Sequence, residues 1–175
     1  MKRSLRIGTI VLSICVVVFV IFQLSTSNER VSEKFASNLF EYPLPPHTTL
    51  IAKHQFNGKN FLDGGGSGGY WNVVAIMELS SSLPRDEIIE YYKRTEAFPY
   101  PKSKNRGVEL ELYFDGESKR MEESRYKLFY FRDQEGRMQP ISRYSSDTTV
   151  SSKTQSDTKF TIQLASGFDY FLNID

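Results

Sequence analysis

The sequence has few of the residues that build disulfides and transition-metal sites, with one cysteine and two histidines among 175 residues. The single cysteine, Cys15, excludes an intramolecular disulfide, so a folded domain must be held together by packing and hydrogen bonds. His47 and His54 are seven residues apart, and on a strand they would point to opposite faces. No cysteine follows Cys15 to complete a ligand set. We therefore expect no metal site and no cofactor.

The sequence also lacks a large excess of charge of either sign, since its formal net charge is +1. Three of the 22 basic residues lie before residue 7, whereas all 21 acidic residues lie after residue 24. The rest of the chain is therefore close to neutral and slightly acidic. A mixed, weak field of this kind gives no reason to expect nucleic acid as a partner.

Charge is entirely absent from residues 7–24, which read IGTIVLSICVVVFVIFQL. As an α-helix these 18 residues extend about 27 Å, close to the hydrocarbon thickness of a bilayer. Basic side chains at Lys2, Arg3 and Arg6 favour a cytoplasmic N-terminus. We predict a cytoplasmic tail at 1–6, a transmembrane helix at 7–24 and a C-terminal domain outside the cell membrane, as a single-pass signal-anchor protein.

A cleaved signal peptide is the main alternative, because Ser25 and Ser27 could flank a cleavage site. The apolar run is at or beyond the upper length of a signal-peptide core, which favours an uncleaved anchor. Lipid attachment to Cys15 is disfavoured because isoleucine precedes it and a further apolar run follows it.

Residues 25–46 are interpreted as a juxtamembrane linker. Val31, Phe35 and Leu39 recur at every fourth position and predict a short, weakly held amphipathic helix. Residues 42–46 read YPLPP, and three prolines favour an extended spacer. The folded extracytoplasmic domain is then expected at residues 47–175.

Within this domain, period-two alternation predicts strands and one helical pattern stands between them. The predicted helix is residues 83–97, with Ser82 as its N-cap and a Glu90–Arg94 pair on its outer face. The predicted strands are residues 48–56, 70–79, 108–114 and 126–132, an edge segment at 137–144, and 160–164. This order predicts an α+β fold, a two-layer domain with a mostly antiparallel sheet and one main helix.

Two strands have clear faces. Trp71, Val73, Ala75, Met77 and Leu79 share one face of residues 70–79. In residues 108–114 the apolar face alternates with Glu109, Glu111 and Tyr113, which we expect on the solvent side. Turns are predicted at residues 57–58 and 135–136, the second of which would pair residues 126–132 with 137–144.

A glycine-rich loop at residues 64–69 has the letters of a nucleophile elbow and of a dinucleotide fingerprint. Both motifs require a helix directly after the loop, whereas a strand is predicted here. We interpret the loop as a hairpin connection, with catalysis by Ser67 and His54 as the alternative. The carboxylates at Asp86, Glu87, Glu90, Glu109, Glu111, Glu122 and Glu123 are interpreted as solvated, because acid–base work needs two of them facing one cleft.

Aromatic residues make up 14% of the chain and favour a sheet-based core. Exposed aromatics could instead form a platform for glycan or peptide. The residues proposed for such a binding surface are Tyr70, Trp71, Tyr113, Tyr126 and Tyr130.

Three segments carry a resemblance to a known group: residues 42–49 (YPLPPHTT), the glycine loop with Tyr70 and Trp71, and residues 83–92 (LPRDEIIEYY). Together they resemble uncharacterised small membrane-anchored proteins of Gram-positive bacteria. The resemblance implies a bacterial cell-surface setting and supplies no catalytic residues.

We therefore expect a non-enzymatic, membrane-anchored domain that binds or scaffolds an envelope component. Two alternatives stay open. One is a weak envelope hydrolase that uses the glycine loop and a histidine, and the other is an accessory subunit of another membrane protein.

Overall fold

A computed structural model describes residues 2–59, 69–103, 106–123, 128–144 and 157–169. Within the first helix, the side chains of residues 2–11 and 20–26 lie outside this description. The predicted glycine loop lies mostly outside it, because only Gly69 of that loop is described.

The core element is a four-stranded sheet with the order β1-β2-β8-β5, in which every neighbouring pair is antiparallel. Its strands are β1 (Thr48–Lys59), β2 (Tyr70–Ser81), β5 (Glu111–Phe114) and β8 (Thr158–Asp169). β2 and β8 lie at its centre and pair along their whole length. The predicted α+β class with a mostly antiparallel sheet is confirmed. The predicted turn at residues 57–58 is wrong, because β1 continues through Gly58 opposite Asn72.

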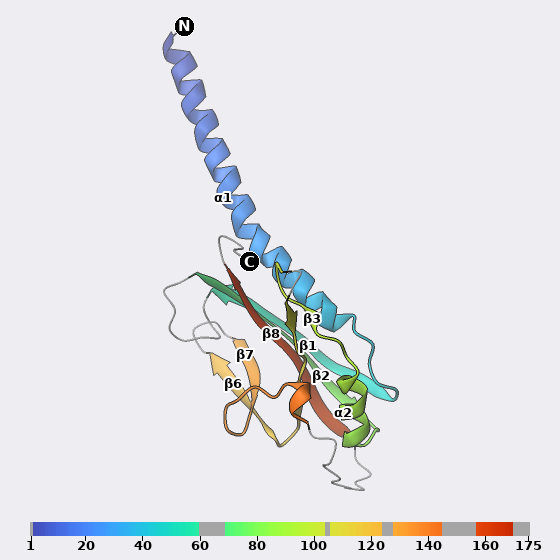
Figure 1. The fold of residues 1–175 in the computed structure, drawn as a ribbon. Coiled ribbons are helices and arrows are strands. Elements are labelled where there is room, and N and C mark those ends of the chain that lie inside the picture. The colour runs from blue at the N-terminus through green and yellow to red at the C-terminus, as the bar shows by residue number, and fades with distance from the viewer. Residues whose placement is uncertain (1, 60–68, 104–105, 124–127, 145–156, 170–175) are drawn as a thin grey trace.

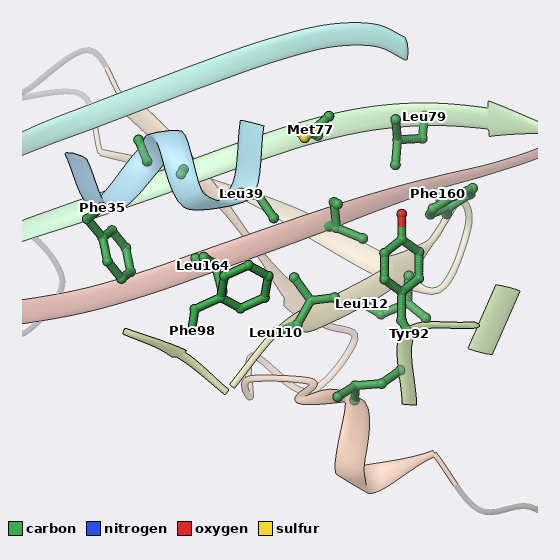
Figure 2. Close-up of a cluster of buried hydrophobic side chains, with 14 of the residues drawn as sticks. Phe35, Leu39, Met77, Leu79, Tyr92, Phe98, Leu110, Leu112, Phe160 and Leu164 are labelled. Atoms are coloured by element: carbon green, nitrogen blue, oxygen red, sulfur yellow. The ribbon is translucent and has the colours of Figure 1, made fainter. Parts of the chain in front are cut away.

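One face of the sheet is covered by helices (Figure 1). The helices in the described residues are α1 (Lys2–Phe40), α2 (Arg85–Lys93) and the short 3-10 helix η1 (Ile141–Arg143), and a small ribbon, β3 (Phe98–Pro99) with β4 (Gly107–Val108), lies beside them. Figure 2 shows Phe35, Tyr92, Leu112 and Leu164 converging here from four elements. The predicted inward face of β2 is confirmed, since Val73, Ala75, Met77 and Leu79 all lie in this cluster.

The second half of α1 is part of this core. Phe35 is 2% exposed and Leu39 is fully buried against the sheet. The prediction of a weakly held linker helix is therefore wrong, because the stripe spaced by four packs along β2. The proline segment is also fixed to the domain: the Tyr42 hydroxyl hydrogen-bonds Thr95 Oγ1 at 2.8 Å, and the Pro43 carbonyl accepts a bond from Tyr91.

The first half of α1 projects away from the domain (Figure 1). The structure describes the side chains of residues 12–19 in this half, and all eight of these side chains are exposed. Among the described residues, no helix is long and apolar enough to cross a membrane. The remaining side chains of the predicted span, 7–11 and 20–24, lie outside the description.

The opposite face of the sheet is partly covered by a hairpin of β6 (Ser118–Glu123) and β7 (Leu128–Asp133). Leu128 and Phe129 of the hairpin bury Val74 and Ile76 of β2. The predicted pairing of residues 126–132 with 137–144 is wrong. The turn forms, with Gly136 at φ 84°, but Pro140 cannot donate to a ladder, and the chain makes a single bridge to Glu111 before η1.

The predicted helix at 83–97 is shorter than expected, since α2 covers only Arg85–Lys93. Pro84 stands at its N-cap position without a side-chain cap, so Ser82 does not have the predicted role. Glu90 pairs with Lys93 at 3.1 Å instead of with Arg94. The inward residues Ile88, Ile89 and Tyr92 are buried as predicted.

Candidate functional site

Polar side chains form a strip across the hairpin face of the sheet. In β8, Phe160, Ile162 and Leu164 pack into the helix-side core, so Thr161 and Gln163 point to the other face. Thr161 lies between Glu78 of β2 and Tyr113 of β5, and Gln163 lies beside Glu111 of β5. His54 of β1 completes the row. We call these six residues, His54, Glu78, Tyr113, Glu111, Thr161 and Gln163, the polar strip.

Glu111 is the most enclosed charged group of the strip, at 4% exposed. Its carboxylate accepts hydrogen bonds from the Tyr113 hydroxyl, from Gln163 Nε2 at 2.9 Å and from Arg132 Nη1 at 3.3 Å. The prediction that Glu111 and Tyr113 face solvent is therefore wrong. The alternation of apolar and polar residues in 108–114 correctly separates the two faces of the strand. It carries no information about the hairpin that covers the face with Glu111 and Tyr113.

Burial governs the titration of this group. It raises the pKa of the Glu111 carboxyl above its ordinary value, although hydrogen bonds from Tyr113 and Gln163 and the charge of Arg132 act in the opposite direction. The pKa of the Tyr113 phenol is raised as well, first by burial and then by the neighbouring Glu111 charge. The Glu111 carboxyl therefore takes up a proton at a higher pH than an exposed glutamate does.

The same group also joins the hairpin to the sheet. Gln163 Oε1 accepts the Phe131 backbone N–H at 2.8 Å, and Arg132 Nη1 donates to the Phe131 carbonyl at 3.0 Å. These bonds satisfy backbone groups of β7 on its sheet-facing side. We infer that Glu111, Tyr113, Arg132 and Gln163 act first as a structural clamp.

His54 and Glu78 form the second charged contact of the strip. His54 Nε2 lies 3.2 Å from Glu78 Oε1, and each side chain is 32% exposed. The imidazole stacks beside Phe56 and meets the edge of Phe129, with ring centres 6.2 and 4.9 Å apart. The predicted alternative partner of this histidine, Ser67, lies outside the described residues. His47 is exposed, at the start of β1, with φ of 55°.

The described residues contain no group of three or more histidine, cysteine or carboxylate side chains that could hold a metal ion.

A groove of about 160 Å³ lies at the end of the polar strip. We call it the distal groove; it is lined by Ile51, Glu78, Leu79, Asp115, Ser118, Phe131, Lys159, Phe160 and Thr161. Thr161 is 8% exposed. The groove therefore brings together the Glu78 and Asp115 carboxylates, the Lys159 side chain and the Thr161 side chain.

The distal groove lies at the end of the sheet away from the projecting half of α1. Near that half, Ser32 of α1 accepts a hydrogen bond from Trp71 at the start of β2. Farther along α1, the Phe40 carbonyl accepts one from Lys53, which pairs with Met77. Leu79, which lines the groove, lies beyond that level.

The structure does not unite the five aromatic residues predicted as a binding surface. Tyr70 is 57% exposed, whereas Tyr113 is 2% exposed inside the clamp. Trp71 packs on the helix side and donates to Ser32 Oγ at 2.9 Å, on the opposite face from Tyr113. Tyr130 is half-buried below the Arg132 guanidinium, and Tyr126 lies outside the described residues.

Sequence reasoning missed Arg132, Gln163 and Thr161. The alternation of residues 160–164 assigns Thr161 and Gln163 to the face opposite the core, but it gives no sign that a hairpin covers that face. Arg132 carries no local signal either, since its partner Glu111 is 21 residues away on another strand.

Comparisons with known proteins do not assign this arrangement. No protein-family model and no curated protein matches the sequence, and no solved structure matches the fold.

Proposed function

We propose that this chain is a membrane-anchored extracytoplasmic domain that binds or scaffolds a component of a bacterial cell envelope. One observation carries the proposal: α1 is a single continuous helix that is built into the core at its C-terminal end and exposes apolar side chains in its projecting half. The large exposed ones are between 54% and 66% accessible, namely Leu12, Ile14, Val16, Val17, Val18 and Phe19. An apolar surface of this extent marks a contact with membrane or protein.

The sequence around these side chains supports a membrane as that contact. Residues 7–24 hold no charge, and their helix would extend about 27 Å, close to the bilayer's hydrocarbon core. Lys2, Arg3 and Arg6 precede them, which favours an N-terminus in the cytoplasm and a domain outside.

The junction between anchor and domain is short. Leu24 ends the apolar run and Asn28 is already buried, so about 6 Å of helix separates them. Two contacts fix the helix at this level: Lys102 Nζ donates to Asn28 Oδ1 at 2.8 Å, and Trp71 Nε1 donates to Ser32 Oγ. An anchor of this kind holds the domain near the membrane in one orientation, with the distal groove directed away from the lipid.

A domain held in one orientation near the membrane suits a scaffold for an envelope component. The same exposed apolar helix would also suit an accessory subunit that packs its helix on another membrane protein. The resemblance to small membrane-anchored proteins of Gram-positive bacteria agrees with either role.

The test uses a C-terminally tagged full chain in intact bacterial cells. We expect the tag to sediment with membranes at the full mass of 20.2 kDa and to be cleaved by external protease. Val17→Arg places a charge near the middle of the span, where it costs about 2.5–3.5 kcal/mol, and should reduce membrane insertion. Leu50→Arg, at an exposed position of β1, is the matched control and should not.

A chain that is released from the membrane, or whose tag is protected in intact cells, would overturn the proposed topology. If the chain is anchored, crosslinking before lysis separates the two roles. An accessory subunit loses its crosslinked partner when the apolar run is replaced by polyleucine, whereas an envelope-binding domain keeps it.

A further inference from the structure

We propose that the end of the domain next to the projecting half of α1 rests on phospholipid headgroups, with Tyr70 among the headgroups and Arg106 against a lipid phosphate. The inference rests on the proposed function, because it needs α1 as a membrane anchor, and it adds a second contact between domain and lipid. We call this region the membrane-proximal end; its described residues used here are Lys59, Gly69, Tyr70, Lys102 and Arg106.

Hydrogen bonds place this end beside the point where α1 leaves the domain. Lys102 Nζ donates to Asn28 Oδ1 of α1 at 2.8 Å and to the Asp169 carbonyl of β8 at 3.0 Å. Asp169 pairs with Tyr70 in the sheet. In Figure 1 the start of β2 and the end of β8 lie at the level where α1 leaves the domain. Tyr70 therefore lies at the level of Asn28, about 6 Å of helix beyond Leu24, where the apolar run ends.

Tyr70 is exposed at this level. It is 57% accessible, and among the residues that the structure describes it is the only exposed aromatic residue outside α1. Tyrosine favours the membrane–water interface, because its ring can lie among apolar atoms while its hydroxyl stays with water and headgroups. A single exposed aromatic residue far from the anchor would need no explanation. The position of Tyr70 beside the apolar run points to lipid.

Arg106 lies at the same end. Its backbone carbonyl accepts the Tyr100 N–H at 3.2 Å, and the Tyr100 hydroxyl donates to the carbonyl of Gly167, two residues before Asp169. The Arg106 side chain is exposed, with its guanidinium carbon 6.0 Å from the centre of the Tyr100 ring. A guanidinium binds phosphate through two parallel N–H donors, so this side chain suits the phosphate of a headgroup.

The described charges at this end include more cations than carboxylates. Lys59, at the end of β1, is a second exposed cation. Each carboxylate nearby has a cation beside it: Glu29 precedes Arg30 in α1, and Asp169 lies close to Lys102. The resulting excess of positive charge favours a surface that carries phosphate.

The test places a fluorescent dye at position 69 of the full chain by Gly69→Cys, combined with Cys15→Ser so that the label is unique. A Cβ added at Gly69 meets no described atom within 4 Å, so the side chain fits. The chain is reconstituted into vesicles of phosphatidylglycerol and phosphatidylcholine that contain a lipid with a spin-labelled headgroup, which quenches nearby dyes. We expect the dye at position 69 to be quenched, and more strongly than by a lipid that is spin-labelled in the middle of its acyl chain.

Leu50→Cys supplies the matched control position. Leu50 is exposed on the same strand as Lys59, and the nine residues between them extend about 30 Å away from the membrane-proximal end. The dye at position 50 should therefore lose no emission to the headgroup quencher.

Two substitutions separate a headgroup contact from mere proximity to the membrane. Arg106→Gln should lower the ratio of quenched to unquenched dye at position 69 about fivefold, the effect of one basic side chain at an anionic surface. Tyr70→Ser should also lower this ratio, because the ring no longer enters the headgroup region. Arg143→Gln, at an exposed position of η1, is the matched control and should leave the ratio unchanged. An unchanged far-UV circular dichroism spectrum shows that each variant is folded.

An unquenched dye at position 69 in a chain that floats with the vesicles would overturn the headgroup contact and leave the anchor in place. Stronger quenching by the acyl-chain label, or unchanged quenching in the folded Arg106→Gln and Tyr70→Ser variants, would overturn the contact as well. A chain that does not float with the vesicles overturns the anchor and, with it, this inference. Flotation therefore distinguishes the failure of the proposed function from the failure of the headgroup contact alone.

Discussion

Replacing Arg132 by methionine should lower the free energy of unfolding by about 3 kcal/mol at pH 8 and by much less at pH 5. The side chains of Arg132 and of its partner Glu111 are 13% and 5% exposed. Removing one member of a buried pair costs about 3–5 kcal/mol because the other charge is left without compensation. We expect the lower end, since Tyr113 and Gln163 still donate to Glu111.

The pH dependence follows from the direction of the Glu111 pKa. Burial already raises this pKa in the folded protein, and loss of the Arg132 charge raises it further. A group with a raised folded pKa contributes stability that is fully present below its unfolded pKa and is lost as the pH rises through the folded pKa. Each pH unit between the two pKa values is worth about 1.4 kcal/mol. The cost of the substitution should therefore grow from pH 5 to pH 8.

Urea unfolding followed by far-UV circular dichroism at both pH values measures this effect as the difference between variant and wild type. Arg94→Met, at the exposed end of α2, is the matched control and should change stability by less than about 0.5 kcal/mol. Adding Glu111→Gln to Arg132→Met should remove most of the extra pH dependence. If Arg132→Met costs the same at pH 5 and pH 8, Glu111 is not the charge that Arg132 compensates.

Three further substitutions test other parts of the structure. Leu39→Ala should lower the free energy of unfolding in urea by about 2–5 kcal/mol, because Leu39 is fully buried, whereas Lys34→Ala at an exposed position of α1 should change it little. If both substitutions have equally small effects, this part of α1 is a linker and not part of the core. Trp71→Phe should cost about 1 kcal/mol through the lost bond to Ser32 Oγ, measured by thermal unfolding, and no loss would argue against this contact. Gly136→Ala should cost about 1–2 kcal/mol because φ is 84°, and an unchanged melting temperature would contradict that turn geometry.

Local patterns determined much of the fold. The alternation in residues 70–79 and 160–164 predicted two strands with the correct inward faces, because the side-chain period of a strand is fixed by the backbone. The buried face of α2, formed by Ile88, Ile89 and Tyr92, was also predicted correctly, because the helical period of 3.6 residues places these three side chains on one side. The class of fold followed from the order of these elements.

The pairing of the hairpin was decided only by tertiary structure. Residues 118–123 read SKRMEE and show no alternation, since β6 exposes most of its side chains on both sides. Its partner, β7, is recognisable as a strand, but a strand pattern does not say which neighbour it pairs with. Pro140 disfavours the alternative pairing of β7 with residues 137–144, which lie closer to β7 in the sequence, because proline has no N–H to donate to a strand ladder.

The sequence by itself determined which side chains share a face, where charge is absent and that no disulfide is possible, because these depend on neighbours along one chain. Tertiary structure alone decided that residues 28–40 belong to the core, that Glu111 is buried beside Arg132, and that Thr161 ends in a groove with Glu78 and Asp115. These outcomes depend on which surface covers another, and the partners lie 21 or more residues apart. A pattern read from one strand shows its two faces, but the energy of burying a charge or a hydroxyl there is set by atoms that arrive from elsewhere in the fold.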